Sequence, residues 1–579
     1  MNRRDLLVAG LLVGLLLLAL GPLARLGLDP HHDGIMLKPA MDVMTGQVLF
    51  RDTFSQYGAL TTYLQVLALW INPGLLSLRI LTVATYTAAL LLLYVVWRRF
   101  LPRSLAALSA FLFILIIPAN ELDYWNHALW PLVPWSSVFA ILFQTIGFYA
   151  VFQIISSEKA VRAGWLLGLA IAGAFWCRQP VGVIMAGCAG VTWGALYWTG
   201  WRPNGASGSA IVSGVLKGSI IGHAPLLGSI VFSGALPAWW YQNFVWPGKW
   251  SEAMDWYETL VPALHWGRAV MLLLLMLAVA LPLWAKKFRP SLPASVPIAC
   301  YLVFGGVLVW QRDQVLQVLA LRGGAWAFVL PLVILIQAMM DATLACTRRG
   351  QPRSLESYLV ASLSVFCLGS LVQLYPSADP WHVCFALAPT FGLIVYALWR
   401  WSGWPAPMVA LALSAAFLPS AYAKFQATRQ ALAAPLVTLT TPAVLRGMRV
   451  SPTEARNYGR VAETLRRVMQ QRPDIPGVVV GNDALPLCFL TNLANPTPYV
   501  VTWAGLSTNA DNERRVRYIS RVRPLIFFQR ADWNAIGRFY RNAHYVPLLY
   551  VEEIAMEIAV PRELADAMGV RAYGAPAKP

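Results

Sequence analysis

Charged residues are scarce in this sequence. Asp, Glu, Lys and Arg make up 12% of its 579 residues, whereas soluble domains carry about 25%. Hydrophobic residues make up 58% of the chain, and its mean hydropathy is +0.56. This composition offers too little polar surface to cover several water-soluble domains, and it is too apolar for a disordered chain. We therefore expect a polytopic membrane protein.

Several common motifs are also missing. The 7 cysteines form no CxxC pair and no metal-binding spacing, so we interpret them as small core residues. The sequence has no P-loop, no GxGxxG and no G-x-S-x-G, which argues against nucleotide hydrolysis, dinucleotide chemistry and a serine-hydrolase triad. It also has no N-x-S/T acceptor site with x other than Pro, which favours a bacterial membrane over a eukaryotic lumen.

The chain carries 45 Lys and Arg residues against 27 Asp and Glu residues. A nucleic-acid partner would require this charge to cluster on a polar surface with interleaved aromatic residues. Instead, much of it lies in short loops between apolar runs, as the positive-inside rule describes. We therefore expect no nucleic-acid partner. The distribution predicts an integral protein of the bacterial inner membrane with its N-terminus inside and its C-terminal tail outside.

Apolar runs long enough to cross the bilayer predict about thirteen transmembrane helices. The first follows Arg3 and Arg4, and a cleaved signal peptide is the alternative interpretation of that run. Residues 59–71 are too short to span, so we expect them to lie in the membrane interface or to enter it part way. The predicted spans are 6–28, 76–97, 105–118, 131–155, 164–176, 181–199, 210–232, 268–285, 292–310, 325–343, 355–374, 382–399 and 404–421.

The predicted domains are a membrane module over 1–421, whose first external loop covers 29–75, and an outer α/β domain over 422–579. The tail has no long apolar run, and its pattern predicts one amphipathic helix and several strands. The helix is Thr453–Gln470, and the strands are Gly477–Val480, Leu525–Phe528, Val546–Val551 and Ile554–Val560.

Function in such a protein is sought in the outward loops, where four stretches are unusual: 29–34 with 46–58, 121–127, the Trp-rich 239–266, and 375–382. Carboxylates at a membrane boundary can act as general bases. A zinc site is disfavoured because His31, His32 and Asp33 are consecutive and cannot all reach one ion without strain. The remaining interpretation is base-assisted group transfer at the outer face.

The chain resembles the GT-C superfamily of integral-membrane glycosyltransferases, closest to its protein-mannosyltransferase and aminoarabinose-transferase branch. The resemblance rests on an acid directly after the first span, a helix, and the segment 46–58 that ends in Gln56-Tyr57-Gly58. The Tyr-Pro-x-x-Asp-x-x-His pattern at 375–382 adds to it, as do the many spans and the outward tail.

This resemblance implies a sugar donor on a polyprenyl phosphate and a hydroxyl acceptor on a glycan, lipid or protein of the cell envelope. The family's first-loop acid matches Asp33, which would deprotonate the hydroxyl for inverting attack. Fixed cations would bind the leaving phosphate, helped by Asp379 and His382. The candidate cations are Lys38, Arg51, Arg178, Arg312 and Arg322. Many relatives have two adjacent acids where this chain has His-His-Asp, so a divalent metal remains open.

Further substrate-binding candidates, ranked lower, are His32, Asp52, Gln56, Tyr57, Glu121 and Asp123. Some candidates have structural alternatives. Asp33 could cap the following helix, and Asp52 is expected to pair with Arg51 or cap a turn. Trp239 and Trp240 are first interpreted as an interfacial aromatic belt.

Two other functions stay open. A flippase or transporter of a lipid-linked glycan would require charges at mid-membrane depth and helices broken in related halves, and no internal repeat is found. An O-antigen-ligase-type transferase would rely on a large external loop with Arg and His. Glycosyl transfer is the leading hypothesis, and the sugar and acceptor are not predicted.

Overall fold

The computed structural model describes most of the chain. The described residues are 2–117, 132–156, 159–201, 203, 207–248, 293, 299, 303, 324–347, 354–374, 380–481, 483–490, 509–529, 544–552 and 556–570. The predicted spans at 268–285 and 292–310 lie almost entirely outside this part of the chain.

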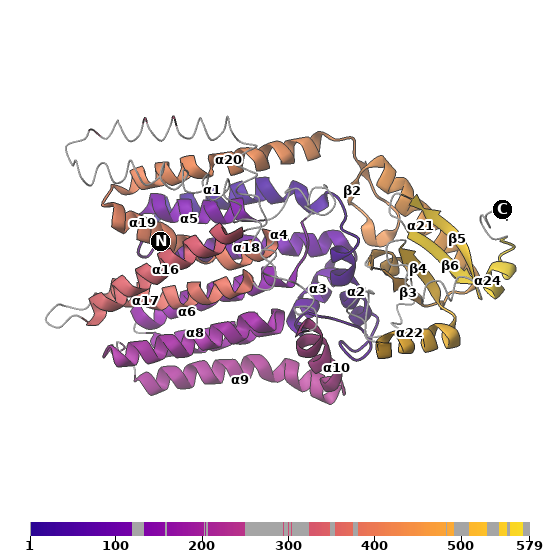
Figure 1. Cartoon of the computed structure of the whole chain (residues 1–579), viewed down its shortest axis with the longest axis horizontal. Coiled ribbons are helices and arrows are strands. Elements are labelled where there is room, and N and C mark those ends of the chain that lie inside the picture. The colour runs from indigo at the N-terminus through magenta and orange to yellow at the C-terminus, as the bar shows by residue number, and fades with distance from the viewer. Residues whose placement is uncertain are drawn as a thin grey trace.

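Long apolar helices lie lengthwise in one bundle, and a small sheet lies beyond one end of it (Figure 1). Within the described residues, seven helices are long and apolar enough to cross a membrane, or eight if one bent pair counts as a span. The protein is therefore an integral membrane protein. The seven are formed by α1 (Arg3–Leu20), α4 (Leu75–Trp97), α6 (Ser136–Ser156), α7 (Ala160–Cys177), α8 (Gln179–Trp198), α9 (Gly208–Phe232) and α17 (Leu355–Ser370), and the bent pair is α18 (Pro380–Leu387) with α19 (Phe391–Ser402). The other apolar helices are α5 (Arg103–Ile116), α16 (Gly324–Thr347) and α20 (Ala406–Ala433).

Two predicted spans differ in shape from the observed helices. The span predicted at 382–399 is broken into α18 and α19, which meet at 58°. Pro389 lies at this break, and proline cannot continue the backbone hydrogen bonding of a helix. The last span, predicted to end at 421, continues as α20 to Ala433, because the residues after 421 are rich in strong helix formers.

Small residues bring α7 and α9 into close contact. Gly164 and Gly168 on α7 face a matching Gly-xxx-Gly series on α9. A Cβ atom at Gly168 would lie 2.1 Å from the carbonyl oxygen of Val215, and one at Gly218 would lie 2.2 Å from that of Trp165. Such backbone approach is the usual mode of packing between helices in lipid.

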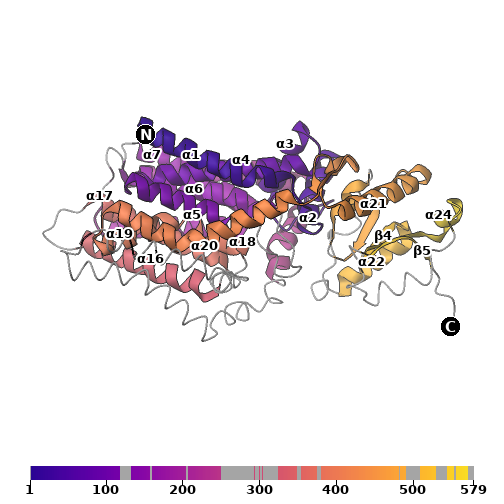
Figure 2. The same ribbon diagram turned by 90° about the horizontal axis from the view of Figure 1, so that it is seen from above.

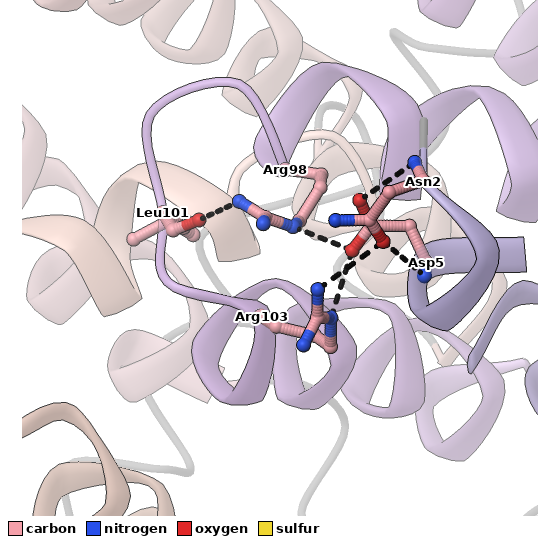
Figure 3. Close-up of polar contacts among 5 residues, drawn as sticks. All are labelled: Asn2, Asp5, Arg98, Leu101 and Arg103. Carbon is pink, nitrogen blue, oxygen red and sulfur yellow. Dashed lines mark hydrogen bonds and ion pairs between the residues drawn. The ribbon is translucent and has the colours of Figure 1, made fainter. Parts of the chain in front are cut away.

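An ion cluster joins α1 to the α4–α5 connection at the end of the bundle farthest from the sheet (Figures 1 and 3). One oxygen of Asp5 accepts hydrogen bonds from Nε of Arg98 at 2.9 Å and from Nε of Arg103 at 2.8 Å. Asn2 and Asp5 also form a capping box at the start of α1. The cluster therefore fixes the first helix against the bundle.

The loop after α1 (the first loop) forms two short helices at the other end of the bundle, α2 (His32–Met44) and α3 (Ala59–Ile71). The 13 residues of α3 are too few to cross a bilayer, as the sequence predicted. Near them lie α10 (Leu236–Trp240) and a π-helical turn at Tyr241–Val245 (Figure 1).

The C-terminal part contains a four-stranded mixed sheet in the order β3-β4-β6-β5. The pair β3–β4 is parallel, and the other neighbours are antiparallel. The predicted amphipathic helix and all predicted strands are confirmed within a few residues. The elements are α21 (Pro452–Gln471), β3 (Gly477–Val480), α22 (Asn509–Val522), β4 (Leu525–Gln529), β5 (Tyr545–Val551), β6 (Met556–Pro561) and α24 (Arg562–Ala567).

The first loop and the C-terminal part share a hydrophobic core where α2 lies close to the start of α21 (Figure 2). Leu37 of α2, Leu78 of α4 and Tyr458 of α21 belong to one buried cluster. The backbone N–H of Leu485 donates to the carbonyl oxygen of Pro30 at 3.1 Å. The sheet-bearing part is therefore packed directly against the loop that carries the predicted site.

Candidate functional site

The start of α2 carries a pair formed by Asp29 and His32. One carboxylate oxygen of Asp29 accepts the backbone N–H of His32 at 2.8 Å, and the other lies 2.7 Å from Nδ1 of the His32 ring. Burial acts to raise the pKa of Asp29, but the neighbouring charges of His32 and His31 and the hydrogen bonds from His32 hold that pKa well below its usual range. Asp29 therefore carries a stable negative charge that orients His32.

Asp33, the predicted base, is completely buried in an ion pair with Arg79 of α4. Its Oδ2 atom lies 2.6 Å from Nη2 of Arg79 and also accepts the N–H of Asp29 at 2.9 Å. Burial raises the pKa of Asp33, and the charge of Arg79 opposes this rise. The side chain of Asp33 is 0% exposed in this arrangement, and its role as the base stays a prediction.

Arg178 is the residue that connects the end of α7 to the start of α8. Its extended backbone ends one helix and begins the next. The side chain donates from Nη1 to the hydroxyl of Ser137, and its Nη2 lies 3.1 Å from Nε2 of His382 on α18. The guanidinium also lies 6.0 Å from the ring centre of Phe385. Arg178 and His382, from distant parts of the sequence, thus form one pair of basic residues (the basic pair), in which the guanidinium donates and Nε2 of His382 accepts.

Tight backbone contact places Tyr57 near Arg178. The N–H of Gly58 donates to the carbonyl oxygen of Cys177 at 3.1 Å, and a Cβ atom at Gly58 would lie 2.0 Å from the carbonyl oxygen of Trp176. Gln56 donates to the Tyr57 hydroxyl at 2.7 Å. Burial raises the pKa of Tyr57 to about 12, against the opposing effects of Gln56 and Arg178. Tyr57 is therefore a neutral hydrogen-bonding group.

The π-helical turn supports this loop from the other side. Oε1 of Gln242 accepts the N–H of Ser55 at 2.9 Å, and Nε2 of Gln242 donates to the carbonyl oxygen of Phe50 at 2.8 Å. Asn243 donates to the carbonyl oxygen of Ser55 at 3.3 Å. Single π turns within helices occur frequently at functional sites. Here the turn presents two amides to one loop and fixes its path.

Trp135 connects the two halves of the site. Its ring centre lies 5.0 Å from that of His32 and 6.4 Å from that of His382. The ring centre of Tyr57 lies 6.5 Å from that of the same indole. Its indole nitrogen has no hydrogen-bond acceptor among the described residues. The structure therefore gathers His32, Tyr57 and His382 around one aromatic ring, and His382 in turn contacts Arg178.

Other predicted residues are engaged elsewhere in the loop. Lys38 is 2% exposed and lies 2.5 Å from Asp42, to which Thr53 also donates. Its charge is compensated, which favours a structural role over the predicted donor binding. Arg51 pairs with Asp52 at 2.9 Å, as the structural alternative for Asp52 predicted, and also donates to the carbonyl oxygen of Ser233 at 3.1 Å.

Five candidates lie outside the described residues, so their predicted roles stay predictions: Arg312, Arg322, Asp379, Glu121 and Asp123. Within the described part of the chain, no group of three or more His, Cys, Asp and Glu side chains is arranged to hold a metal ion. Trp239 lies buried against Trp176 and Phe244, in a packing role rather than on an open aromatic surface.

Sequence reasoning missed three residues that build the site. Arg79 lies within the predicted span 76–97, and a cation in a transmembrane segment requires a partner and signals a buried ion pair. Asp29 was seen in the first-loop motif but was not ranked. Trp135 lacks a sequence signal, because it lies in an aromatic-rich run and is selected by its position between two histidines.

Comparison of the sequence with protein-family models and with curated proteins gives no match. Comparison with solved structures gives several matches. The oligosaccharyltransferase AglB of Archaeoglobus fulgidus, in complex with an inhibitory peptide and a dolichol-phosphate, aligns with 97% of this chain and 74% of its own, at 12% identity and a TM-score of 0.50. The fold is GT-C-like.

A second structure of this GT-C-like group, AglB tethered to an acceptor peptide containing the NVT sequon, aligns with 91% of the chain and 69% of its own, at 12% identity and a TM-score of 0.50. ArnT of Cupriavidus metallidurans bound to undecaprenyl phosphate aligns with 96% of the chain and 97% of its own, at 11% identity and a TM-score of 0.40. The matches to AglB confirm the predicted resemblance to GT-C glycosyltransferases at the level of the fold.

Proposed function

We propose that the protein transfers a sugar from a polyprenyl-phosphate donor to a hydroxyl of a cell-envelope acceptor at the outer face of a bacterial inner membrane. The observation that carries this proposal is the basic pair of Arg178 and His382, with His382 beside Trp135. The fold shared with AglB, which was solved with a dolichol-phosphate, supports the same class of donor.

The basic pair is suited to a leaving phosphate. Two different nitrogens of Arg178 are held by Ser137 and His382, so the guanidinium has a fixed orientation before substrate arrives. Charge grows on the phosphate oxygen as the bond to the sugar breaks, and preorganised cations stabilise that charge. A guanidinium matches the planar geometry of phosphate oxygens better than an ammonium does.

The position of Trp135 suits a sugar between donor and acceptor. Its indole contacts both the basic pair and the first-loop histidine, His32. In this scheme the hydroxyl attacks the anomeric carbon on the face opposite the phosphate, which inverts its configuration. Asp33 was predicted to take the proton, but its burial with Arg79 supports a positioning role instead.

The decisive experiment uses the full chain in lipid nanodiscs with a panel of undecaprenyl-phosphate-linked hexoses and a cell-envelope lipid extract as acceptor. Sugar transfer and release of undecaprenyl phosphate are followed by mass spectrometry. We expect transfer from at least one donor, and loss of transfer in Arg178→Ala. Arg446→Ala, an exposed arginine of the C-terminal part, is the matched control.

Two results would contradict the proposal. One is a wild-type protein that neither binds undecaprenyl phosphate nor uses any donor of the panel. The other is movement of a fluorescent polyprenyl-phosphate sugar across proteoliposomes without transfer to an acceptor, which would favour the flippase.

A further inference from the structure

The Asp29–His32 pair has the geometry of an oriented base. Oδ2 of Asp29 lies 2.7 Å from Nδ1 of the ring, and Oδ1 accepts the backbone N–H of the same histidine at 2.8 Å. A carboxylate at Nδ1 favours the tautomer with its proton on that nitrogen, which leaves the lone pair on Nε2. The ring is thus held both in orientation and in the form that accepts a proton.

Solvent exposure of the side chains distinguishes the Asp29–His32 pair from Asp33. The side chains of His32 and Asp29 are 21% and 18% exposed, whereas those of Asp33 and Arg79 are 0% exposed. A general base must come within hydrogen-bond reach of the proton that it removes. His32 also contacts Trp135, the residue that contacts the basic pair of Arg178 and His382.

We infer that His32, oriented by Asp29, is the general base that activates the acceptor hydroxyl. This inference rests on the proposed glycosyl transfer and assigns a catalytic residue to that site. Asp33 becomes a positioning residue, because its ion pair with Arg79 and its hydrogen bond from the N–H of Asp29 hold the start of α2.

The step balances as follows. The acceptor oxygen forms a bond to the anomeric carbon, and its proton passes to Nε2 of His32. The bond between the anomeric carbon and the phosphate oxygen breaks, and its electron pair leaves with the lipid phosphate. Asp29 stabilises the imidazolium, while Arg178 and His382 stabilise the additional phosphate charge.

The charge state of His32 depends on groups from several elements. Asp29 lies in direct contact, and the ring of His31 lies 4.7 Å away. The Asp33–Arg79 pair adjoins it in sequence and structure. Across Trp135 lie Tyr57, Arg178 and His382. Asp29 favours the protonated ring, and the nearby cations and His31 oppose it.

The test measures kcat and the donor KM between about pH 5 and 9, using the full chain and the undecaprenyl-phosphate hexose that is turned over in the panel. His32→Gln should lower kcat by about 10²–10⁴-fold, leave the donor KM nearly unchanged, and remove the acidic limb of the rate profile. Imidazole should restore part of the activity of His32→Gly. His544→Gln, an exposed histidine in the C-terminal part, is the matched control.

Asp29→Asn is the second variant. Its amide oxygen can still accept the backbone N–H of His32, so the start of α2 is preserved, while the negative charge is lost. We expect a fall in kcat of similar order and a displaced pH profile. These readouts would not move if Asp29 only capped the helix, and thermal unfolding identifies any variant that fails to fold.

The outcomes separate this inference from the proposed function. If the wild type transfers sugar and His32→Gln keeps its acidic limb and its kcat within about twofold, His32 is not the base, and glycosyl transfer stands. If Asp33→Asn instead abolishes kcat without loss of thermal stability, Asp33 is the base. If the wild type neither binds undecaprenyl phosphate nor uses a donor, both fail.

Discussion

Asp33 and Arg79 form an ion pair of 2.6 Å in which both side chains are fully buried. The other terminal nitrogen of Arg79 donates to the carbonyl oxygen of Leu26 at 2.7 Å. One arginine of α4 therefore holds the first loop at two points. The residue that sequence reasoning chose as the base is part of the framework that places its neighbours, Asp29 and His32.

Arg79→Met should strongly destabilise the protein. Removing one partner of a buried ion pair leaves an uncompensated charge, which typically costs about 3–5 kcal/mol. The double variant Asp33→Leu/Arg79→Met should recover much of this loss, because it removes both charges. Thermal unfolding in detergent measures the effect. An Arg79→Met protein as stable as the wild type would show that the pair does not hold the loop.

Gly58→Ala should weaken lipid-phosphate binding without touching a charged group. A Cβ atom there would lie 2.0 Å from a backbone oxygen of Trp176, so the loop must move away from the turn that carries Arg178. We expect a rise in the Kd for undecaprenyl phosphate and a lower unfolding temperature. Gly10→Ala on α1 is the control, since a Cβ there has nothing within 4 Å. Equal effects of the two variants would contradict this account.

Sequence reasoning predicted the elements better than the site. Apolar runs and turn residues determine helices and strands locally, so α4, α9, α21 and β3 were predicted within a few residues. Composition also decided the class of protein. Pairing of buried charges is different, because it depends on which helices lie side by side. The partner of Asp33, Arg79 of α4, could not be identified from its sequence neighbourhood, whereas Lys38 pairs with Asp42 one turn away on the same helix.

The site itself was predicted in part. Arg178 was chosen because a cation between two apolar runs requires an explanation, and His382 because it belongs to the pattern at 375–382 on which the GT-C resemblance rests. Their contact across 204 positions of sequence is a property of the fold. Whether Arg312, Arg322 and Asp379 join them stays a prediction, as does the division of the chain at residue 421.

Gly168→Leu should destabilise the helix bundle. The site of its Cβ lies 2.1 Å from the carbonyl oxygen of Val215, so a larger side chain must separate α7 from α9. Overpacking of this kind typically costs about 1–3 kcal/mol, and more when backbone is displaced. Gly190→Leu on α8, where a Cβ has nothing within 4 Å, is the matched control. Unfolding temperatures that fall equally in both variants would point to a general effect of leucine.

Asp29 should make the free energy of unfolding depend on pH in the acidic range. Its folded-state pKa is held below the unfolded value of about 3.9, so its contribution is fully present at neutral pH and is lost as the pH falls below about 4. Asp29→Asn should therefore lower the unfolding temperature at pH 7 by a few degrees. The difference between the two proteins should shrink as the pH falls below the unfolded-state pKa, and it should vanish only when the pH reaches the lower folded-state pKa of Asp29. A difference that persists unchanged in acid would assign the effect to packing rather than to charge.

Arg178→Lys should separate charge from geometry in the basic pair. Arg178 contacts Ser137 and His382 through different nitrogens of one rigid guanidinium and lies against Phe385. A lysine ammonium keeps the charge but cannot reproduce this arrangement. We expect the Kd for undecaprenyl phosphate to rise about tenfold, which is about 1.4 kcal/mol.

The coupling between the two residues completes this test. If Arg178 and His382 bind one phosphate together, the effects of Arg178→Lys and His382→Ala on Kd should not add, because each variant disrupts the arrangement on which the other depends. A double-mutant cycle on undecaprenyl-phosphate binding measures the difference. Strictly additive effects would place the two side chains at separate ligand groups, so only one of them would hold the phosphate. The 3.1 Å contact between Arg178 and His382 would then serve only to pack α18 against the turn between α7 and α8.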